Sequence, residues 1–147
     1  MAAIRTADVT WKGDLTSGAG TIDYVSSGAF SRMPVSWAAR TEAHEGRTSP
    51  EELLAAAHAS CFAMAFSNGL AKSGTPAERL SVRATVTFDK TADGWSVASS
   101  HLTVRGLVPG ATAEGFRAAA EAARDGCPIS RALAGNVTLS VEAALES

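Results

Sequence analysis

The stretch from Ser49 to Gly74 constrains the fold most, because it has the pattern of one long helix that is apolar on nearly every face. Ser49 suits the N-cap, Pro50 the first helical position and Glu52 the N3 position of a capping box. Gly74 is a plausible C-terminal stop. A helix that is apolar all round is buried, and one chain of 147 residues can hardly surround it. We therefore expect a homodimer that packs two such helices together.

The residues before this helix indicate a small sheet. Residues 4–13 and 19–26 alternate in polarity around a glycine-rich turn, which predicts a hairpin. The next stretch, residues 30–49, is less regular. Pro34 argues against a central strand there, and the polar run from Glu42 to Ser49 is predicted to be a loop.

The residues after the helix indicate further strands and two more helices. Residues 81–90 and 95–107 alternate around the turn "TADG", which predicts a second hairpin. Residues 111–126 form an amphipathic helix pattern that ends at Gly126, and "CPISRAL" predicts a short third helix. Residues 136–145 alternate as a last strand. This order predicts an α+β fold in which antiparallel sheet wraps a long buried central helix, within a single domain over residues 1–147.

Composition and charge exclude several classes of partner. The formal charge is −2, and the 13 Lys and Arg residues are scattered rather than clustered, so nucleic acid is not expected. No apolar run reaches the roughly 18 residues of a membrane span, and the first residues lack the apolar core of a signal peptide. We therefore expect a cytoplasmic protein. His58 and Cys61 form an H-x-x-C pair on one helix face, which would suit zinc. A zinc site needs four ligands, and His44, His101 and Cys127 show no paired spacing, so no metal site is predicted.

The two cysteines, Cys61 and Cys127, lie 66 residues apart and form no C-x-x-C motif. In a reducing compartment such thiols are more often catalytic, redox-active or simply buried than joined in a structural disulfide. Cys127 precedes Pro128 and suits the N-cap of the short helix, where the helix dipole favours the thiolate.

Cys61 has the opposite local setting. It lies mid-helix beside Phe62, Met64 and Phe66, and apolar burial raises the pKa of a thiol. By local chemistry Cys127 is the more reactive thiol, unless a cation reaches Cys61. His58, one turn before Cys61, is expected to be a buried histidine with one hydrogen bond.

The stretch "TSPEELLAAAHASCFAMAFS", followed by "GCPIS", resembles the osmotically inducible protein C and organic hydroperoxide resistance family, OsmC/Ohr. The resemblance extends to "TWKGDL", "GAGT" and "VTLSVEAAL", so it covers essentially the whole chain. "WKGDL" and "AAHASCF" favour the OsmC branch. The resemblance implies an OsmC-like α+β fold in an intertwined homodimer.

It also implies a thiol peroxidase of oxidative and osmotic stress defence, without a cofactor, that reduces organic hydroperoxides and more weakly hydrogen peroxide. Cys61 matches the family's peroxidatic cysteine, and Cys127 matches the resolving cysteine, with which Cys61 would form a disulfide. An external dithiol, on a lipoylated or thioredoxin-like protein, would reduce that disulfide. Phe62, Met64 or Phe66 could then line a pocket for alkyl or lipid hydroperoxides.

The resemblance also implies a glutamate at the start of the helix, which Glu51 in "SPEEL" matches. In the OsmC branch it implies an arginine from the loop before the helix, which Arg40 in "WAARTE" matches. Arg47 and Arg5 are alternatives to Arg40. Such an arginine would stabilise the Cys61 thiolate, and Glu51 would hold its guanidinium.

Glu51 and Cys61 are ten residues apart on the predicted helix, which has no internal Pro or Gly before Gly69. Ten residues correspond to a rise of about 15 Å, too far for one compact site. We therefore expect Glu51 to act across the dimer interface rather than in its own chain.

Two other functions fit the same residues. The chain could be a binding protein for a small hydrophobic ligand, with both cysteines structural. It could also be a disulfide isomerase or general thiol oxidoreductase that is indifferent to peroxide. Loss of two thiols per chain after one equivalent of hydroperoxide would favour the peroxidase.

Overall fold

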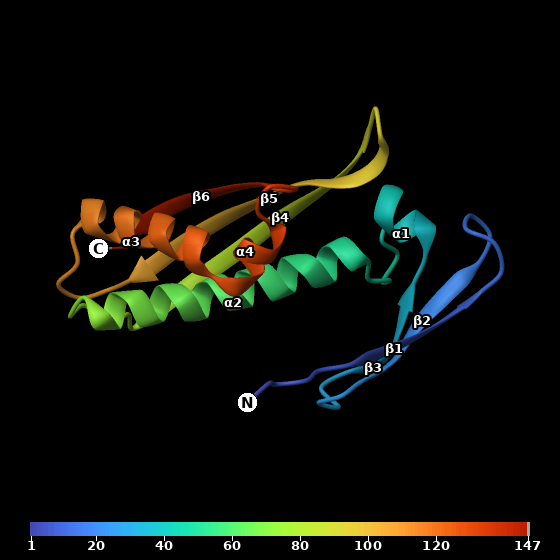
Figure 1. Cartoon of the computed structure of the whole chain (residues 1–147), viewed down its shortest axis with the longest axis horizontal. Helices are drawn as coiled ribbons and strands as arrows, with labels where there is room; N and C mark the ends of the chain where they lie inside the picture. Colours follow the sequence, from blue (N-terminus) through green and yellow to red (C-terminus); the bar gives the residue numbers. More distant parts are fainter. Residues whose placement is uncertain (147) are drawn as a thin grey trace. The chain divides into compact units, whose positions relative to one another are not determined.

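The computed structural model describes residues 1–146 of the chain, which divides into two compact units, Met1–Leu53 and Leu54–Ser147. The first unit holds a three-stranded antiparallel sheet in the order β1-β2-β3, drawn in blue in Figure 1. The prediction of one domain over the whole chain stays a prediction. The elements of this unit are β1 (Ala7–Lys12), β2 (Ala19–Val25), β3 (Ser31–Val35), α1 (Trp37–Thr41) and the start of α2 (Pro50–Lys72).

The first hairpin is confirmed, whereas β3 and α1 add structure to the stretch that the sequence pattern left irregular. Pro34 lies inside β3, and β3 is the edge strand of its sheet. Proline lacks an N–H donor and is tolerated at such an edge. Ser36 caps α1 by accepting the N–H of Ala39, and residues 42–47 form the predicted loop.

The second unit holds a sheet in the order β4-β5-β6. The α+β class is confirmed, and the predicted hairpin is the antiparallel pair β4–β5. The expectation of purely antiparallel sheets is wrong for β6, which pairs with β5 in parallel. The helices between these two strands carry the chain back to the start of β5, which makes the pair parallel. The elements are β4 (Arg79–Thr91), β5 (Gly94–Leu107), α3 (Ala113–Gly126), α4 (Pro128–Leu133) and β6 (Thr138–Leu145).

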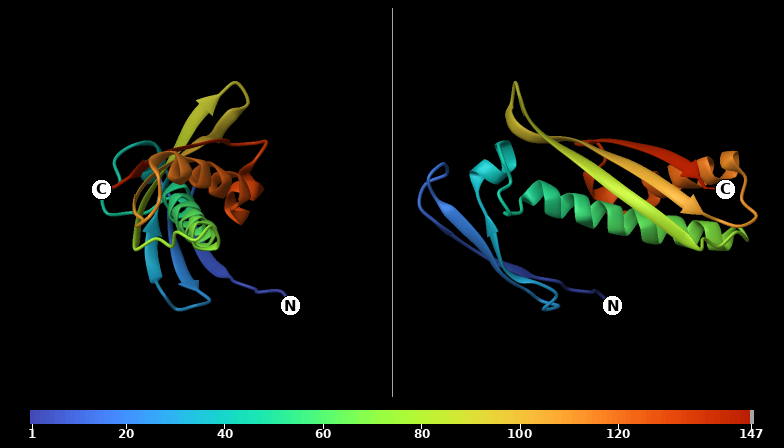
Figure 2. Two further views of the ribbon diagram at one scale, coloured as in Figure 1. Left: turned by 90° about the vertical axis from the view of Figure 1, so that its left-hand side faces the viewer. Right: turned by 180° about the vertical axis from the view of Figure 1, so that it is seen from behind.

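The core of the second unit lies between this sheet and the helices α2 and α3. Figures 1 and 2 show α2 and α3 along the same face of the sheet. Phe66 of α2 packs against Phe116 of α3, with ring centroids 4.9 Å apart. A Cβ at Gly106 of β5 would lie 2.6 Å from the Phe116 ring, so only glycine allows α3 to pack this close. The core residues include Phe62, Phe66, Leu70, Leu102, Val104, Phe116 and Ala120.

Helix α2 begins at Pro50, as predicted, and ends at Lys72, shortly before Gly74. The Ser49 hydroxyl accepts the N–H of Glu52, as an N-cap should. The carboxylate of Glu52 accepts the Thr48 hydroxyl, at 2.8 Å. These local bonds fix where the helix starts.

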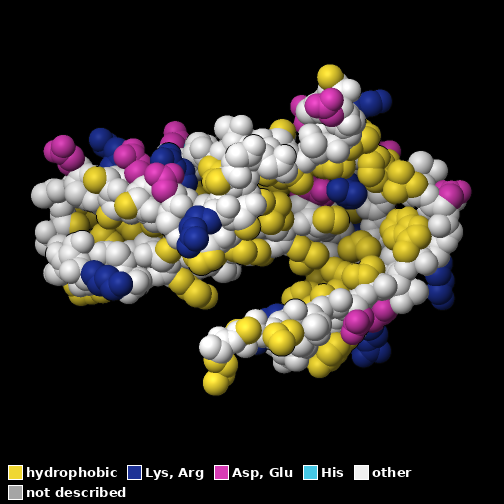
Figure 3. Space-filling model, viewed as in Figure 1, with side chains coloured by type: hydrophobic (Ala, Val, Ile, Leu, Met, Phe, Trp, Pro, Cys, Tyr) yellow, Lys and Arg dark blue, Asp and Glu magenta, His cyan; other side chains and the backbone are white. Residues whose placement is uncertain are grey.

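Only one stripe of α2 is buried within the chain. His58, Phe62, Phe66 and Leu70 are buried, at intervals of four residues. The opposite face is exposed, and Figure 3 shows hydrophobic side chains open to the surface along this helix. Burial on all faces is therefore not seen in the single chain, and its completion by a second copy stays a prediction. The exposed apolar residues of α2 include Ala56, Ala57, Met64 and Ala71.

Helix α2, with 23 residues and a mean hydropathy of 1.3 over its most apolar window, is long and apolar enough to cross a membrane by composition alone. The core helix of a soluble protein has the same character. One stripe of α2 packs into the core of the second unit, and 22% of that most apolar window is buried within the chain.

Candidate active site

In the first unit, Arg40 and Glu51 form a hydrogen-bonded ion pair. Arg40 lies in the last turn of α1, and Glu51 lies in the first turn of α2. Nε of Arg40 donates to both carboxylate oxygens, at 3.2 and 3.1 Å, and Nη2 donates to Oε1 at 2.6 Å. Two donors on one carboxylate hold the guanidinium in a fixed plane.

The surroundings of this ion pair limit its contact with water. The Glu51 side chain is 9% exposed and the Arg40 side chain 27% exposed. The Arg40 guanidinium carbon lies 5.5 Å from the centroid of the Trp37 ring, close enough for a cation–π contact. A guanidinium fixed in this way keeps its charge and a defined direction.

The two alternative arginines are placed differently. Arg47 pairs with Glu45 at 3.5 Å through two exposed side chains. Nη1 of Arg5 donates to the neighbouring Ile4 carbonyl oxygen. Exposed pairs of this kind contribute little to stability. Of these three arginines, Arg40 is the one that the structure places on Glu51.

An apolar cavity of about 410 Å³ adjoins Arg40 within the first unit. The Trp11 ring, which lines this cavity, packs closely on Gly20, because a Cβ at residue 20 would lie 2.6 Å from the ring. Trp11 is further held by a hydrogen bond from Nε1 to the Gly13 carbonyl oxygen, at 3.0 Å. The cavity therefore has apolar walls and the charged guanidinium of Arg40 at one side. Its lining consists of Val9, Trp11, Leu15, Val35, Ser36, Trp37, Arg40 and Pro50.

In the second unit, Cys61 of α2 lies beside Cys127, the N-cap residue of α4. Both are free thiols; Cys61 is partly exposed and Cys127 is buried. The Cys127 sulfur accepts the backbone N–H of Ser130 at 3.3 Å, and its S–H donates to the Ser130 hydroxyl oxygen at 3.4 Å. The predicted N-cap position of Cys127 is confirmed. Sequence positions 66 residues apart thus form one dithiol.

The two thiols have opposite pKa shifts. Burial raises the pKa of Cys61, the Ile129 backbone N–H lowers it, and the Cys127 thiol raises it further. Burial also acts to raise the pKa of Cys127. Hydrogen bonds from Ser130, from Cys61 and from the Ile129 N–H outweigh it, and the pKa of Cys127 is lowered. Within the second unit, Cys127 is therefore the thiol that ionises first, as its local sequence predicts.

A third polar group, His58, lies one turn before Cys61 on α2 and is fully buried. Its Nδ1 lies 2.6 Å from the Ser100 hydroxyl oxygen on β5, and its Nε2 lies 2.7 Å from the Ser130 hydroxyl oxygen on α4. The expectation of one hydrogen bond is wrong, because both ring nitrogens are bonded. Ser100 and Ser130 were not predicted, since serines in alternating or short helical segments carry no distinctive signal.

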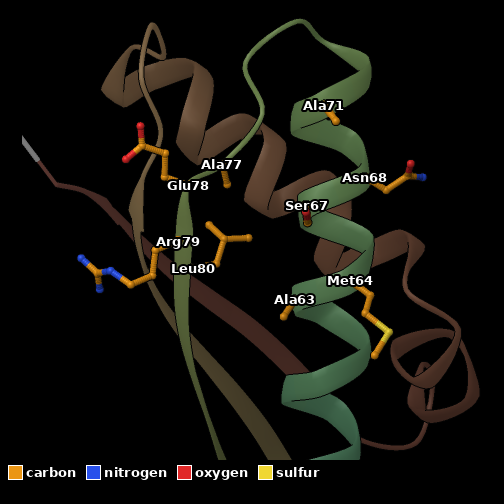
Figure 4. Close-up of a pocket in the computed structure, with 9 residues that line it drawn as sticks. All are labelled: Ala63, Met64, Ser67, Asn68, Ala71, Ala77, Glu78, Arg79 and Leu80. Atoms are coloured by element: carbon orange, nitrogen blue, oxygen red, sulfur yellow. The ribbon is translucent and has the colours of Figure 1, made fainter.

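The aromatic residues beside Cys61 do not form an open pocket. Phe62 and Phe66 are fully buried in the core, which corrects the expectation that they line a substrate site. Met64 is 72% exposed. It borders a groove of about 650 Å³ between α2 and the start of β4, and Figure 4 shows it pointing away from β4. Neither cysteine lines this groove.

The family profile described as OsmC-like protein matches residues 43–142 of this chain. Peroxiredoxin OsmC of Escherichia coli (strain K12) is 36% identical over 132 residues, which cover 90% of this chain and 91% of that protein. The Shigella flexneri Peroxiredoxin OsmC gives the same values.

Solved structures agree with these relatives. The organic hydroperoxide resistance protein OhrB of Bacillus subtilis superposes with a TM-score of 0.72 at 26% identity, covering 94% of this chain and 97% of that one. An organic hydroperoxide resistance protein from Elizabethkingia anophelis superposes with a TM-score of 0.75 at 22% identity, covering 99% of this chain and 100% of that one. The second likeness concerns the fold alone.

Proposed function

The chain belongs to the OsmC-like protein family, and we propose that it is a two-cysteine peroxidase in which Cys61 reduces organic hydroperoxides and Cys127 resolves the oxidised thiol. A peroxidase-like enzyme of hydroperoxide detoxification is what its curated relatives and the hydroperoxide resistance structures support. The observation that carries the finer proposal is the direct interaction between two free thiols, Cys61 and Cys127.

In the first step, the Cys61 thiolate attacks one oxygen of the hydroperoxide. A sulfur–oxygen bond forms, the oxygen–oxygen bond breaks, and the leaving alkoxide takes up a proton to become an alcohol. Cys61 is then a sulfenic acid. In the second step, the Cys127 sulfur attacks Cys61 Sγ, and the disulfide forms with release of water.

The raised pKa of Cys61 means that its thiolate needs a cation. Arg40, already fixed by Glu51, is the proposed donor of that charge, and it would also stabilise the charge that develops on the leaving oxygen. Glu51 and Cys61 lie on one unbroken helix, at a separation of about 15 Å of rise. We therefore assign the Arg40–Glu51 pair of one copy to the Cys61 of a second copy, in a homodimer.

The exposed apolar face of α2 supports such a dimer. A second copy packed on Ala56, Ala57 and Met64 would remove apolar surface from water. The dimer would also complete the burial that the α2 sequence pattern predicts.

The substrate class is supported by the cavity beside Arg40. Its apolar side chains, among them Trp11 and Leu15, would accept the alkyl or aryl group of a hydroperoxide next to the guanidinium. Hydrogen peroxide has no such group, so the cavity would favour organic hydroperoxides. The proposed compartment is the cytoplasm, where a dithiol on a lipoylated or thioredoxin-like protein would reduce the disulfide.

The test is a thiol titration before and after one equivalent of cumene hydroperoxide. We expect the wild-type protein to lose two thiols per chain, and Cys61→Ser to lose none. Unchanged thiols in the wild type would favour a hydrophobic-ligand binding protein, and equal activity on protein disulfides without peroxide would favour a general thiol oxidoreductase. Either result contradicts the proposal.

Steady-state kinetics with tert-butyl hydroperoxide then test the arginine. Arg40→Ala should lower kcat/KM by at least about 100-fold, in the range of a lost transition-state hydrogen-bond donor. Arg47→Ala is the matched control, because it removes an exposed guanidinium that is also paired with a glutamate. Equal losses in both variants would remove Arg40 from the mechanism.

A further inference from the structure

A continuous chain of hydrogen bonds runs from the resolving thiol into the core of the second unit. It starts at Cys127, passes through Ser130 to His58, and ends at Ser100. His58, Ser130 and Ser100 are at most 1% exposed. Three separate elements contribute to it, namely α4, α2 and β5. The two-step thiol chemistry described above does not use these buried groups.

The hydrogens in this chain can be arranged so that every bond has one donor and one acceptor, starting from the Cys127 thiol. If the Cys127 S–H donates to the Ser130 hydroxyl oxygen, the Ser130 O–H is left to donate to His58 Nε2. His58 then carries its proton on Nδ1 and donates it to Ser100. In this arrangement each group donates its hydrogen bond to the next one, in the order Cys127, Ser130, His58 and Ser100. His58 Nε2 is thus an acceptor at the end of a path from Cys127.

We propose that Ser130 and His58 form a proton relay that activates Cys127 for its attack on oxidised Cys61. Ser130 is the catalytic residue of the relay, because its hydroxyl contacts the reacting sulfur. His58 is a positioning residue that acts through Ser130. This inference rests on the proposed function, since it concerns the disulfide-forming step of that reaction.

The Cys127 S–H proton passes to the Ser130 hydroxyl while the Ser130 proton passes to His58 Nε2, which leaves a Cys127 thiolate. The thiolate forms a bond to Cys61 Sγ, and the Cys61 sulfur–oxygen bond breaks with its electron pair on the departing hydroxide. His58 returns its proton through Ser130 to that hydroxide. The products are the Cys61–Cys127 disulfide and water, and His58 ends neutral.

The state of His58 suits this role. Burial lowers its pKa, so its imidazole is neutral and able to accept a proton at neutral pH. The groups placed against it from β5 and α4 are the hydroxyls of Ser100 and Ser130, which carry no charge. The titratable groups at the outer end of the relay are the two thiols, Cys61 from α2 and Cys127 before α4.

Burying a histidine at position 58 for structural reasons alone would be unfavourable, because burial removes its polar nitrogens from water. His58 continues the stripe of Phe62 and Phe66, where a hydrophobic side chain would be buried without any hydrogen-bond requirement. Both its nitrogens need partners instead, and two other elements supply them. A relay accounts for that arrangement because it requires an acceptor shielded from water.

The test separates the two chemical steps in a single turnover with cumene hydroperoxide. Sulfenic acid formation at Cys61 is followed by trapping with dimedone, and disulfide formation by loss of the second thiol, at pH values from 6 to 9.5. The main variant is Ser130→Ala, which removes the hydroxyl but keeps the backbone N–H on the Cys127 sulfur. Ser140→Ala is the matched control, because Ser140 bonds His101 Nδ1 at 2.6 Å and its bond lies outside the relay.

We expect Ser130→Ala to form the sulfenic acid at the wild-type rate and the disulfide about tenfold more slowly at pH 7. The rate should approach that of the wild type as the pH rises past about 8.5, where an ordinary thiol ionises without a base. His58→Gln should show the same pH dependence, and the double variant should be no slower than either single variant. Ser140→Ala should match the wild type.

Two outcomes would overturn the relay. One is disulfide formation in Ser130→Ala that follows the wild type at every pH. The other is slowing by the same factor at every pH, which is the signature of a structural defect. Failure of the proposed function looks different, because the wild type itself would then form no sulfenic acid at Cys61.

Discussion

Arg40 and Glu51 meet through three hydrogen bonds, the shortest being 2.6 Å from Nη2 of Arg40 to Oε1 of Glu51. They come from two different helices, α1 and α2, and are eleven residues apart in the sequence. The turn that brings them together is the polar loop before α2. The pair therefore depends on the path of the chain rather than on any local helix spacing.

Neutralising Glu51 should impair peroxide reduction. Glu51→Gln keeps the shape of the side chain but removes the charge that fixes Arg40, so we expect kcat/KM for cumene hydroperoxide to fall by about 10- to 100-fold. Glu52→Gln is the control, because Glu52 is the neighbouring carboxylate and bonds Thr48 instead. It should stay within about twofold of the wild type. Similar losses in both variants would show that the charge of the helix terminus matters rather than the ion pair.

Trimming the cavity beside Arg40 should change substrate preference. Trp11→Ala removes a large part of the apolar lining, and we expect kcat/KM to fall about tenfold for cumene hydroperoxide and less than twofold for hydrogen peroxide. Trp95→Ala removes another partly exposed tryptophan, one that stacks on Phe88 instead. It should leave both values unchanged. A parallel fall for both peroxides in Trp11→Ala would argue against the cavity as a substrate site.

Burial of His58 should make the fold sensitive to acid. Its pKa is lowered in the folded protein, so below its ordinary value of about 6.5 the unfolded chain binds the proton more readily. The free energy of unfolding should therefore fall as the pH drops from about 6.5 toward the lowered pKa, by at most about 1.4 kcal/mol per pH unit. Urea unfolding at pH 7.5, 6.5 and 5.5 measures this dependence.

In the same urea series, the free energy of unfolding of His58→Gln should fall less than that of the wild type as the pH drops. His101→Gln is the control, because His101 is only half-buried on β5, and it should keep the wild-type dependence. Identical pH dependence in His58→Gln and the wild type would show that another group causes the loss.

A methyl group at Gly106 should destabilise the second unit. The new Cβ would lie 2.6 Å from the Phe116 ring, and overpacking of this kind costs about 1–3 kcal/mol. Gly126→Ala adds the same methyl group at a helical position where the Cβ meets no described atom within 4 Å apart from its chain neighbours and its own helix backbone, and it should be neutral or slightly stabilising. Thermal unfolding compares the two. Equal melting temperatures would mean that α3 shifts away from the sheet at little cost.

Much of the secondary structure was predictable because its signals are local. Ser49 and Pro50 mark the start of α2, Cys127 is the N-cap of α4, and the alternating segments became strands. The strand around Pro34 was not predictable from the sequence. Proline lacks a backbone N–H, and only the strand order shows that β3 lies at a sheet edge, where this donor is not needed. The parallel direction of β6 was likewise decided by the path of the chain through α3 and α4.

The site divides in the same way. Neighbours along the chain are enough to place Cys127 at the start of a helix and Cys61 within an apolar helix. Folding, by contrast, brings Arg40 to Glu51, buries Phe62 in the core and places His58 on Ser130. Such contacts join residues that are distant in sequence, and they depend on how helices and strands pack, which no local pattern records.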